Sequence, residues 1–396
     1  MYHIVFNADE NYIKYTAVLI TNIIHKIDKT SNNASMPICF HILTNHLSQN
    51  TQEKLNALQD SALQDLYPFS IKVYNVDEQI FSGLPTLNGN YSAYWRLLIG
   101  RMLPPDIMRC LYLDVDMLVM CDIREILNLQ FSAPLCAVPD FGRYAGRILE
   151  PKESAKPITF SKKYFNSGFL LLNLEQWRTR NVESQCFAIL QNYHLRFHDQ
   201  DILNAVFQDI YQPLPFSYDY IAQSFGASVC QDESKKHYNI HHTRAEFNAL
   251  NGDIKVLHYC AEKPWNKLIS YVLKGESITQ LWWQYAEITP IFAPILAQEK
   301  LLLKQDYKPY LAGVAILNAN WLSFLKLPFI IQNILNENTS INIFINKALQ
   351  DPNFNRAYEL GRLAIRIATS SKKIKYFVLI LRILRAKIRY KNQTQV

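Results

Sequence analysis

The chain has 396 residues and carries 41 Lys or Arg against 34 Asp or Glu, which gives a formal charge of +7. Hydrophobic residues make up 49% of the chain and charged residues 19%, with only 11 Gly and 17 Pro, and this composition excludes a disordered, fibrous or low-complexity chain. The length allows one large domain with an appendix, or two ordinary domains.

The positive charge is concentrated at the C-terminal end. Ten Lys or Arg and no acidic residue lie between Leu360 and Val396, whereas the rest of the chain has 31 basic and 34 acidic residues. Nucleic-acid binding is not favoured, because no base-reading motif accompanies the basic residues.

The cysteines favour a reducing compartment. All seven are scattered along the chain, and none forms a Cys-x-x-Cys pair, so a disulfide framework is not expected. The first nine residues have neither a basic start nor a long apolar stretch, and we expect no secretory signal. The sequence therefore predicts a cytoplasmic protein.

The first 76 residues alternate between segments of strand type and helix type. The expected strands are residues 2–8, 38–43 and 69–76, and the expected helices are residues 15–27 and 52–63. This alternation predicts a parallel sheet with helices on its faces, in which ligands bind beyond the carboxyl ends of the strands. The polar turn Asp9-Glu10-Asn11 occupies one such end. No glycine fingerprint follows the first strand, so a dinucleotide-type phosphate loop is not expected.

Two aspartates interrupt the apolar, strand-like segment Cys110–Met120. Asp114 and Asp116 are one residue apart, and burying such carboxylates without a partner is costly. A divalent cation such as Mg²⁺ or Mn²⁺ would stabilise both of them. The alternative is a strand that ends at an exposed turn, with both aspartates in solvent.

Two further segments place polar residues beside apolar runs. Asn166-Ser167-Gly168 precede one run, and the missing Cβ of Gly168 would let a ligand or another backbone approach; an ordinary tight turn is the alternative. Asp199-Gln200-Asp201 open an apolar helix, where they either face a ligand or cap the helix.

The segment Val256–Trp265 contains two more candidates. His258 ends a short apolar run and could bind a metal ion through a neutral imidazole nitrogen, with a structural histidine as the alternative. Lys263 could bind a phosphate group as a point charge. The pair His241-His242 has no acidic residue at metal-ligand spacing and is interpreted as surface residues.

The C-terminal third changes character. Residues 276–370 are rich in Ile, Leu and aromatic residues and are expected to form a helical region without an interpretable motif. Within it, Pro309–Ile331 is mostly apolar but is interrupted by polar residues and Pro328, which favours buried or amphipathic helices over a bilayer span.

The last segment, residues 371–396, can form a basic amphipathic helix. Phe377 and Leu384 fall on an apolar face, whereas Arg382, Arg385 and Arg389 line another face. This pattern predicts attachment to the anionic inner face of the cytoplasmic membrane. The alternative is a solvated helix that packs on its own domain.

Taken together, these segments resemble glycosyltransferase family 8, the retaining GT-A enzymes that include bacterial lipopolysaccharide galactosyl- and glucosyltransferases. The resemblance covers about residues 2–270, and the segments occur in the family's order, which chance does not readily produce. They are Ile4–Tyr12, Tyr94–Leu97, Leu111–Asp116, Phe165–Gly168, Asp199–Asn204 and His258–Trp265. The resemblance implies an α/β fold of the GT-A class, a mixed sheet flanked by helices, over residues 1–275.

The resemblance also implies roles for individual residues. Asp114, Asp116 and His258 match the ligands of Mn²⁺, which Mg²⁺ could replace. The matches to catalytic positions around the donor sugar are Gln200, Asp199, Asp140 and Arg96. The matches to nucleotide-sugar-binding positions are Ala8, Asp9, Glu10, Asn11, Tyr12, Arg96, Asp114, Val115, Asn166, Asp199, Gln200, His258 and Lys263.

The expected activity is that of a hexosyltransferase. It would move galactose or glucose from a UDP-sugar to a lipid-linked oligosaccharide such as the lipopolysaccharide core, with retention of configuration. Gln200 is an amide and a poor nucleophile, which favours attack on the same face of the sugar, with the departing phosphate oxygen accepting the proton of the acceptor.

Two alternatives remain open at this point. One is a glycosyltransferase that acts on a protein or polysaccharide acceptor. The other is a catalytically weak or silent UDP-sugar-binding protein, because the segment after His258 departs from the family's usual His-x-x-Gly-x-x-Lys-Pro-Trp. Here Ala261 replaces the glycine, one residue is missing before Lys263, and Glu262 adds an acid.

Overall fold

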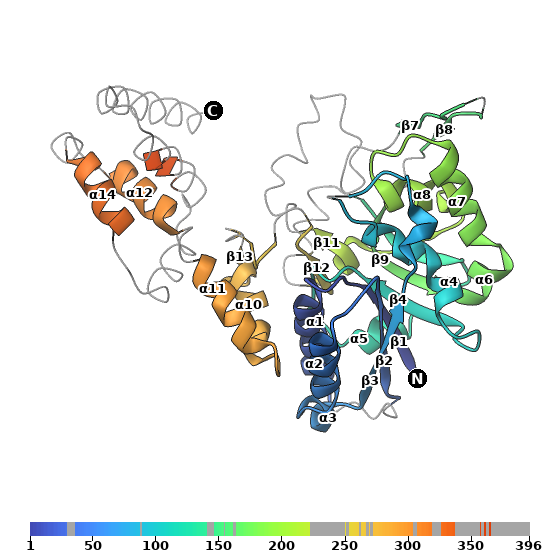
Figure 1. Cartoon of the computed structure of the whole chain (residues 1–396), viewed down its shortest axis with the longest axis horizontal. Helices are drawn as coiled ribbons and strands as arrows, with labels where there is room; N and C mark the ends of the chain where they lie inside the picture. The colour runs from blue at the N-terminus through green and yellow to red at the C-terminus, as the bar shows by residue number, and fades with distance from the viewer. Residues whose placement is uncertain are drawn as a thin grey trace. The chain divides into compact units, whose positions relative to one another are not determined.

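The structure is a computed structural model, and Figure 1 shows the arrangement of its elements. The described residues are 1–29, 36–87, 89–140, 146–153, 155–160, 164–221, 250, 253–260, 263–266, 269, 272–303, 307–318, 326–336, 357, 360–361 and 364–365. The chain divides into two compact units. One comprises Met1–Ala261 with Gln284–Pro294, and the other comprises Glu262–Trp283 with Ile295–Val396.

A seven-stranded sheet forms the centre of the first unit, with the strand order β10-β6-β9-β4-β1-β2-β3. The strands are β1 (Tyr2–Asn7), β2 (Ile38–Thr44), β3 (Phe69–Asn75), β4 (Arg109–Leu113), β6 (Leu135–Pro139), β9 (Phe165–Asn173) and β10 (Gln212–Pro213). The four strands from β3 to β4 are parallel neighbours, whereas β9 runs antiparallel to both β4 and β6. The sheet is therefore mixed, and the three strands expected in the first 76 residues are its parallel part.

Helices and short 3₁₀ segments surround this sheet (Figure 1). They are α1 (Ile13–Lys26), α2 (Gln49–Gln59), α3 (Leu63–Leu66), η1 (Glu78–Phe81), η2 (Ser92–Leu98), α4 (Ile99–Met102), α5 (Ile123–Leu127), α6 (Leu174–Thr179), α7 (Val182–Asn192), α8 (His198–Phe207) and η3 (Phe216–Asp219). The two helices expected in the first 76 residues correspond to α1 and α2. The α1, α2 and α3 helices pack together, and α2 contacts β3.

The main hydrophobic core lies on the face of the sheet that η2, α4, α6, α7 and α8 cover. Val5 of β1, Tyr112 of β4 and Leu172 of β9 point to this face and pack in one cluster with Trp95 and Trp177. Strand β2, which lies between β1 and the edge strand β3, is buried along its whole length, and this explains why its sequence is a nearly continuous apolar run.

A second, three-stranded sheet has the order β11-β12-β5. Its strands are β5 (Met117–Val119), β11 (Tyr220–Ile221) and β12 (Val256–His258). The expectation of one strand through Cys110–Met120 is therefore wrong, because β4 ends at Leu113 and the chain turns before β5 enters this other sheet. The turn carries Asp114 and Asp116 away from the apolar interior of the large sheet, where carboxylates would be unpaired.

The segment Asn166-Ser167-Gly168 also differs from the expectation. All three residues lie inside β9 rather than in a turn that precedes it. Two short hairpins complete the strands: β7 (Ile148–Leu149) with β8 (Ile158–Thr159), and β13 (Val272–Leu273) with β14 (Glu276–Ser277).

The region expected to be helical contains α10 (Ile278–Ile288), α11 (Ala293–Leu303), α12 (Tyr307–Asn318) and α14 (Leu327–Asn336). The second unit has a small core of its own, made by Ala312, Ile316, Leu327, Ile331, Leu360 and Ala364. Two glycines allow close packing there, since a Cβ on Gly313 would collide with the Ala357 carbonyl and one on Gly361 with the Pro309 carbonyl.

Among the described residues, none of the helices combines the length and apolar character that crossing a bilayer requires. Residues 366–396, which include the segment expected to attach to a membrane, lie outside the described residues. The expected divisions after residues 275 and 370 stay predictions.

Candidate active site

The turn that contains Asp114 and Asp116 lies at the carboxyl end of β4. β4 is paired with β9 as far as Leu113, and the Asp114 N–H then donates to the Gly168 carbonyl at 2.8 Å. The Asp116 residue is 6% exposed and the Asp114 side chain 27%. The structure therefore has a turn, as the alternative interpretation expected, but its aspartates face protein groups rather than open solvent.

His258 reaches this turn through strand pairing. β12 runs antiparallel to β5, and His258 lies opposite Met117, the residue that follows Asp116. The His258 Nε2 is 3.4 Å from Asp116 Oδ1 and 4.0 Å from Asp114 Oδ2. Ligand atoms of the three residues all lie within 4.8 Å of one another, so a single metal ion could bind them together.

A third carboxylate, that of Asp219, contacts the ring nitrogen of His258 that faces away from Asp116. Its Oδ1 is 2.8 Å from His258 Nδ1, and the residue is completely buried at the end of η3. Burial raises the pKa of Asp219, and the adjacent imidazole opposes that shift. Burial lowers the pKa of His258, but the carboxylates of Asp219 and Asp116 outweigh burial and raise it well above its ordinary value.

Sequence reasoning missed Asp219. It lies 39 residues before His258 in a segment without a recognisable pattern, and only the pairing of β11 with β12 brings the two together. An acceptor at the far ring nitrogen takes the N–H of a histidine, fixes its tautomer and points the other nitrogen at a metal ion, so Asp219 is part of the site.

Arg96 of η2 connects several of the predicted residues. Its guanidinium lies 2.8 Å from Asp114 Oδ1 and 3.3 Å from Asp199 Oδ2, and it donates to the Ser167 carbonyl at 2.6 Å. The guanidinium also stacks 4.4 Å from the centre of the Tyr112 ring. Burial opposes its charge, but the carboxylates of Asp114 and Asp199 outweigh burial and raise the pKa of Arg96. Arg96 thus stays charged between two carboxylates.

Gly168 is a point of close approach. A Cβ at this position would lie 2.6 Å from His258 Cε1, 2.8 Å from Asp114 Oδ2 and 3.0 Å from Asn166 Oδ1. Such distances are shorter than any normal contact of a Cβ atom, so glycine is required for the two metal-binding candidates to pack against β9. The groups that approach this glycine are side chains, whereas the sequence led us to expect a ligand or another backbone.

Asp140, Asn166 and Gln200 form a hydrogen-bonded group beside Arg96. The Asp140 Oδ2 accepts from Asn166 Nδ2 at 3.2 Å and from Gln200 Nε2 at 3.1 Å. The Gln200 Oε1 in turn accepts from the Ser167 N–H at 3.1 Å. Three of the residues expected around the donor sugar are therefore neighbours, and both ends of the Gln200 amide are engaged.

Helix α8 supports the start of β9 with a second amide, that of Asn204. The Asn204 Oδ1 accepts from the Phe165 N–H, and its Nδ2 donates to the Phe165 carbonyl, each at 2.8 Å. The side chain thus makes the two bonds that a neighbouring strand would make. Gln200 lies one helical turn earlier and bonds Ser167 two residues along the same strand.

Asp201 has a structural role. Its Oδ2 accepts from the N–H groups of Arg196 and Phe197 at 2.8 and 2.9 Å, and its Oδ1 accepts from Tyr164 and Arg147. Asp201 is not the N-cap residue of α8, which is Phe197, but it binds the N–H groups just before the helix, whereas Asp199 faces Arg96 and Gln200 faces Asp140.

The residues from Ala8 to Tyr12 follow the carboxyl end of β1, next to the end of β4. Asp9 Oδ1 accepts from the N–H groups of Asn11 and Tyr12 at 3.0 and 3.1 Å, and Asp9 Oδ2 accepts from Asn90 at 2.8 Å. Ala8 is buried, whereas Asn11 and Tyr12 are exposed. The turn is thus fixed by Asp9, and Asn11 and Tyr12 are its exposed residues.

Glu10 points elsewhere. Its carboxylate accepts from Ser48 Oγ at 2.8 Å and Thr51 Oγ1 at 2.6 Å, in the first turn of α2. Burial would raise the pKa of Glu10, but the hydrogen bonds from Thr51 and Ser48 lower it below its ordinary value. The structure therefore uses this carboxylate to join the turn to α2.

Two predicted residues remain. Val115, between the two aspartates, is buried. Lys263 belongs to the second unit, and Ala261 and Glu262 lie outside the described residues, so the phosphate-binding role of Lys263 stays a prediction.

The residues around Asp114 fit a divalent cation. Two carboxylates and one imidazole, with a carboxylate behind the imidazole, are a donor set that suits Mn²⁺ or Mg²⁺ with oxygen atoms of a substrate completing the shell. Arg96 offsets the charge of Asp114, and the imidazole of His258 lies between the carboxylates of Asp116 and Asp219.

Comparison with known proteins gives one family and several relatives. The model of "Glycosyl transferase family 8" matches residues 3–268. The lipopolysaccharide glucosyltransferase WaaO of Escherichia coli K12 is 28% identical over 59% of this chain and 70% of its own. A lipopolysaccharide 1,2-glucosyltransferase of Escherichia coli is 27% identical over 68% of this chain and 75% of its own.

A solved structure is also similar. The galactosyltransferase LgtC, crystallised with donor and acceptor sugar analogues, superimposes with a TM-score of 0.51 at 23% identity and covers 72% of this chain and 95% of its own. At this identity the similarity concerns the fold, and it confirms the predicted GT-A architecture with a mixed sheet flanked by helices.

Proposed function

The chain belongs to glycosyltransferase family 8, and on this basis we propose that it moves galactose or glucose from a UDP-sugar to a lipid-linked oligosaccharide such as the lipopolysaccharide core. The family assignment confirms the predicted enzyme class, a hexosyltransferase. The observation that carries the proposal is the convergence of Asp114, Asp116 and His258 at the end of β4. The relatives named above, which act on lipopolysaccharide, support the acceptor.

Asp114, Asp116 and His258 would hold Mn²⁺, or Mg²⁺ in its place. A bound divalent cation supplies positive charge that stabilises the diphosphate as it leaves. The residues of the chain prepare for this: Asp219 orients the imidazole of His258, and Arg96 holds Asp114 in place. The family resemblance implies a diphosphate-binding role for Lys263.

Arg96, Asp140, Asn166, Asp199 and Gln200 bind and orient the donor sugar in this proposal. Their mutual hydrogen bonds and ion pairs leave little freedom of movement, so the polar groups are placed before the substrate arrives. Asp9, Asn11 and Tyr12 would bind the uracil and ribose at the neighbouring strand end. Ala8, Glu10 and Val115 support that region of the site.

The sugar is transferred with retention of configuration by attack on the same face. Gln200 cannot form a stable ester-like intermediate, and its amide is held by Asp140 and the Ser167 N–H. The acceptor hydroxyl loses its proton to the departing phosphate oxygen. Trapping a covalent sugar adduct on Asp199, Gln200 or Asp201 by mass spectrometry would rule this route out.

The test of the function is release of UDP from individual UDP-sugars. We expect release from UDP-galactose or UDP-glucose that depends on Mn²⁺ and stops with a chelator, and a faster release with a lipopolysaccharide-core acceptor. GDP-mannose is the matched control and should not react. A protein that binds UDP-sugars without releasing UDP is the silent alternative, and faster release with a protein or polysaccharide acceptor would identify the other alternative.

We further propose that the protein is cytoplasmic and attaches to the inner face of the cytoplasmic membrane through residues 371–396. This attachment would place the site close to a lipid-linked acceptor. Because Leu360 and Ala364 belong to the core of the second unit, the truncation that tests it should remove residues 371–396 and no more.

We expect the truncated protein to lose binding to vesicles that contain anionic lipid and to keep UDP release from a soluble donor. Exchanging Arg382, Arg385 and Arg389 for Glu in the full chain is the matched control, and it should have the same effect as the truncation. Undiminished vesicle binding by either variant contradicts the proposal.

A further inference from the structure

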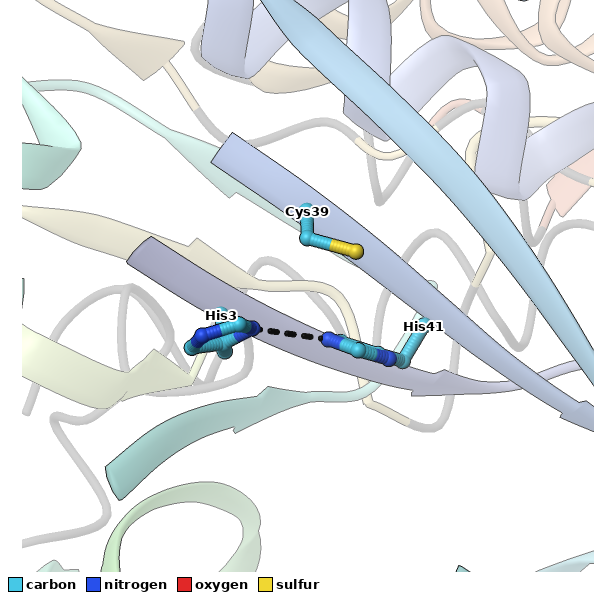
Figure 2. A group of neighbouring side chains, drawn as sticks. All are labelled: His3, Cys39 and His41. Carbon is cyan, nitrogen blue, oxygen red and sulfur yellow. Dashed lines mark hydrogen bonds between the residues drawn. The ribbon is translucent and has the colours of Figure 1, made fainter. Parts of the chain in front are cut away.

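A second cluster of metal-binding side chains lies at the other end of the same sheet. His3 of β1 and Cys39 of β2 are direct partners in the parallel register, and His41 follows Cys39 by two residues, so all three side chains lie on one face. Figure 2 shows them together, with His3 and Cys39 near the amino ends of their strands and His41 two residues further along β2. His3 is five residues before Ala8, or roughly 16 Å along the strand from the end that carries the candidate active site.

The geometry of this cluster is compact. The His3 Nδ1 faces the His41 Nε2 at 3.0 Å, and the ligand atoms of all three residues lie within 4.8 Å of one another. His41 and Cys39 are completely buried, whereas His3 is half-buried. The cluster is therefore shielded from bulk water but open at His3, where an ion can enter.

A further residue lies at the other ring nitrogen of His41. The hydroxyl of Tyr74 on β3 lies 3.0 Å from His41 Nδ1. When Nδ1 carries the proton and donates it to this oxygen, Nε2 keeps a free lone pair that points toward His3. A hydrogen-bonding partner of this kind on the far nitrogen is the usual support of a metal-bound histidine.

We propose that His3, Cys39 and His41 form a binding site for a single Zn²⁺ ion, separate from the site at Asp114. One thiolate and two imidazoles bind Zn²⁺ in preference to Mn²⁺ or Mg²⁺. A water molecule would take the fourth position around the zinc ion. Zinc displaces the proton of the Cys39 thiol, which leaves to solvent. It also replaces the hydrogen bond between the two histidines, and the proton of that bond moves from His3 Nδ1 to the other ring nitrogen of His3.

The charge of the surroundings is compatible with this site. Burial and neighbouring positive groups lower the pKa of His41 to about 3, and burial lowers that of His3, so both rings are neutral and able to bind. Burial raises the pKa of Cys39, which means that the thiolate forms only together with the metal ion. The N-terminal ammonium and the exposed Lys72 oppose a cation, whereas Asp106 near His3 favours one.

The ion would connect β1 to β2 at the ends of the strands remote from the candidate active site. Zinc bound to the folded state stabilises it by mass action, so zinc raises the melting temperature without a direct effect on sugar transfer.

The test uses the full chain freed of metal by a chelator and titrated with Co²⁺ as a probe. We expect a stoichiometric charge-transfer absorption between Co²⁺ and a thiolate, which Zn²⁺ then abolishes by displacement. Co²⁺ at Asp114, Asp116 and His258 gives no such band, because no thiolate belongs to that set. Absence of the band in the wild-type chain overturns the proposal.

Variants assign the band to its ligands. Cys39→Ala and His3→Gln should remove it, and His3→Gln, at a half-buried position, tests the site even if Cys39→Ala fails to fold. Cys110→Ala, in the neighbouring strand β4, is the matched control for a buried cysteine, and Cys260→Ala excludes the cysteine nearest in sequence to His258. A band that persists in His3→Gln, or that disappears only in Cys260→Ala, also overturns the proposal.

Discussion

Polar side chains gather at both ends of the parallel strands of the large sheet, but the two groups differ in charge. At the carboxyl ends, Asp114, Asp116 and Asp219 surround His258, and Arg96 compensates part of their charge. Toward the amino ends, His3, Cys39 and His41 are neutral groups whose ligand atoms lie within 4.8 Å of one another, and the two histidines are hydrogen-bonded. The first group suits a hard divalent cation and a phosphate, whereas the second suits a softer ion.

The two groups also differ in which elements carry them. The acidic group, Asp114, Asp116, Asp219 and His258, lies on chain turns and on the small three-stranded sheet, so its contacts can change when a substrate binds without disturbing the large sheet. The neutral group is built into adjacent strands β1 and β2, where the same residues hold the sheet together. We therefore expect changes at the carboxyl ends to affect binding and changes at the amino ends to affect stability.

Among the substitutions that test this difference, Asp116→Ala should have the largest effect on metal and donor binding. Asp116 is buried and supplies one of three ligands, so we expect the affinity for Mn²⁺ together with a UDP-sugar to fall by more than about 100-fold. Isothermal titration measures it, with circular dichroism as a check on folding. Asp65→Ala, an exposed acid on α3, is the control and should bind normally. Unchanged donor affinity in a folded Asp116→Ala protein refutes the ligand assignment.

Gly168→Ala should lower activity much more than it lowers the stability of the fold. The added methyl group would lie 2.6 Å from His258 and 2.8 Å from Asp114, so these side chains must move, and we expect activity to fall on the order of 100-fold. UDP release and thermal unfolding measure the two quantities. Gly100→Ala is the matched control, since its methyl group would meet Trp177 in the core at 2.5 Å; it should lower the melting temperature and spare the metal affinity. The reverse pattern would break the comparison.

Asp219→Asn should weaken metal binding by roughly 10- to 100-fold. The amide has nearly the shape of the carboxylate but no longer imposes one tautomer and charge on His258. Titration with Mn²⁺, followed by electron paramagnetic resonance, measures the affinity. If Asp219→Asn binds Mn²⁺ as the wild type does, the carboxylate serves only to neutralise a buried histidine. The site at Asp114 would then not depend on Asp219 for metal binding.

The smallest effect should come from Tyr74→Phe at the amino ends. The change removes the hydroxyl that lies 3.0 Å from His41, and we expect the metal-free protein to lose about 1 kcal/mol of unfolding free energy. Urea denaturation measures this loss. The affinity for a UDP-sugar should stay unchanged, and a loss of that affinity would show that the two ends are coupled.

Much of the fold and the acidic group could be predicted from the sequence, because the signals are local. Apolar periodicity marks the first strands and helices, and an Asp-x-Asp pattern inside an apolar run already points to a paired or metal-bound site. The turn at Asp114 was not predictable by the same reasoning, since the apolar residues on both sides fit one strand as well as two.

What the sequence could not reveal depends on strand register. Asp219 and His258 meet because β11 pairs with β12, and His3 meets Cys39 because β1 pairs with β2 in one alignment. A shift of one residue in either pairing would point the side chains to opposite faces. The contact of Glu10 with Ser48 and Thr51 is likewise set by packing between a turn and a helix.

The two amides of α8 also limit which changes in chain length the enzyme can tolerate. Gln200 and Asn204 bond Ser167 and Phe165, so one helical turn is matched to two residues of β9. Inserting or deleting a single residue between them would rotate one amide by about 100° around the helix axis. The contact of Asn204 with Phe165 and the contact of Gln200 with Ser167 could then not both form. We therefore expect the segment between Gln200 and Asn204 to tolerate substitutions but not changes in length.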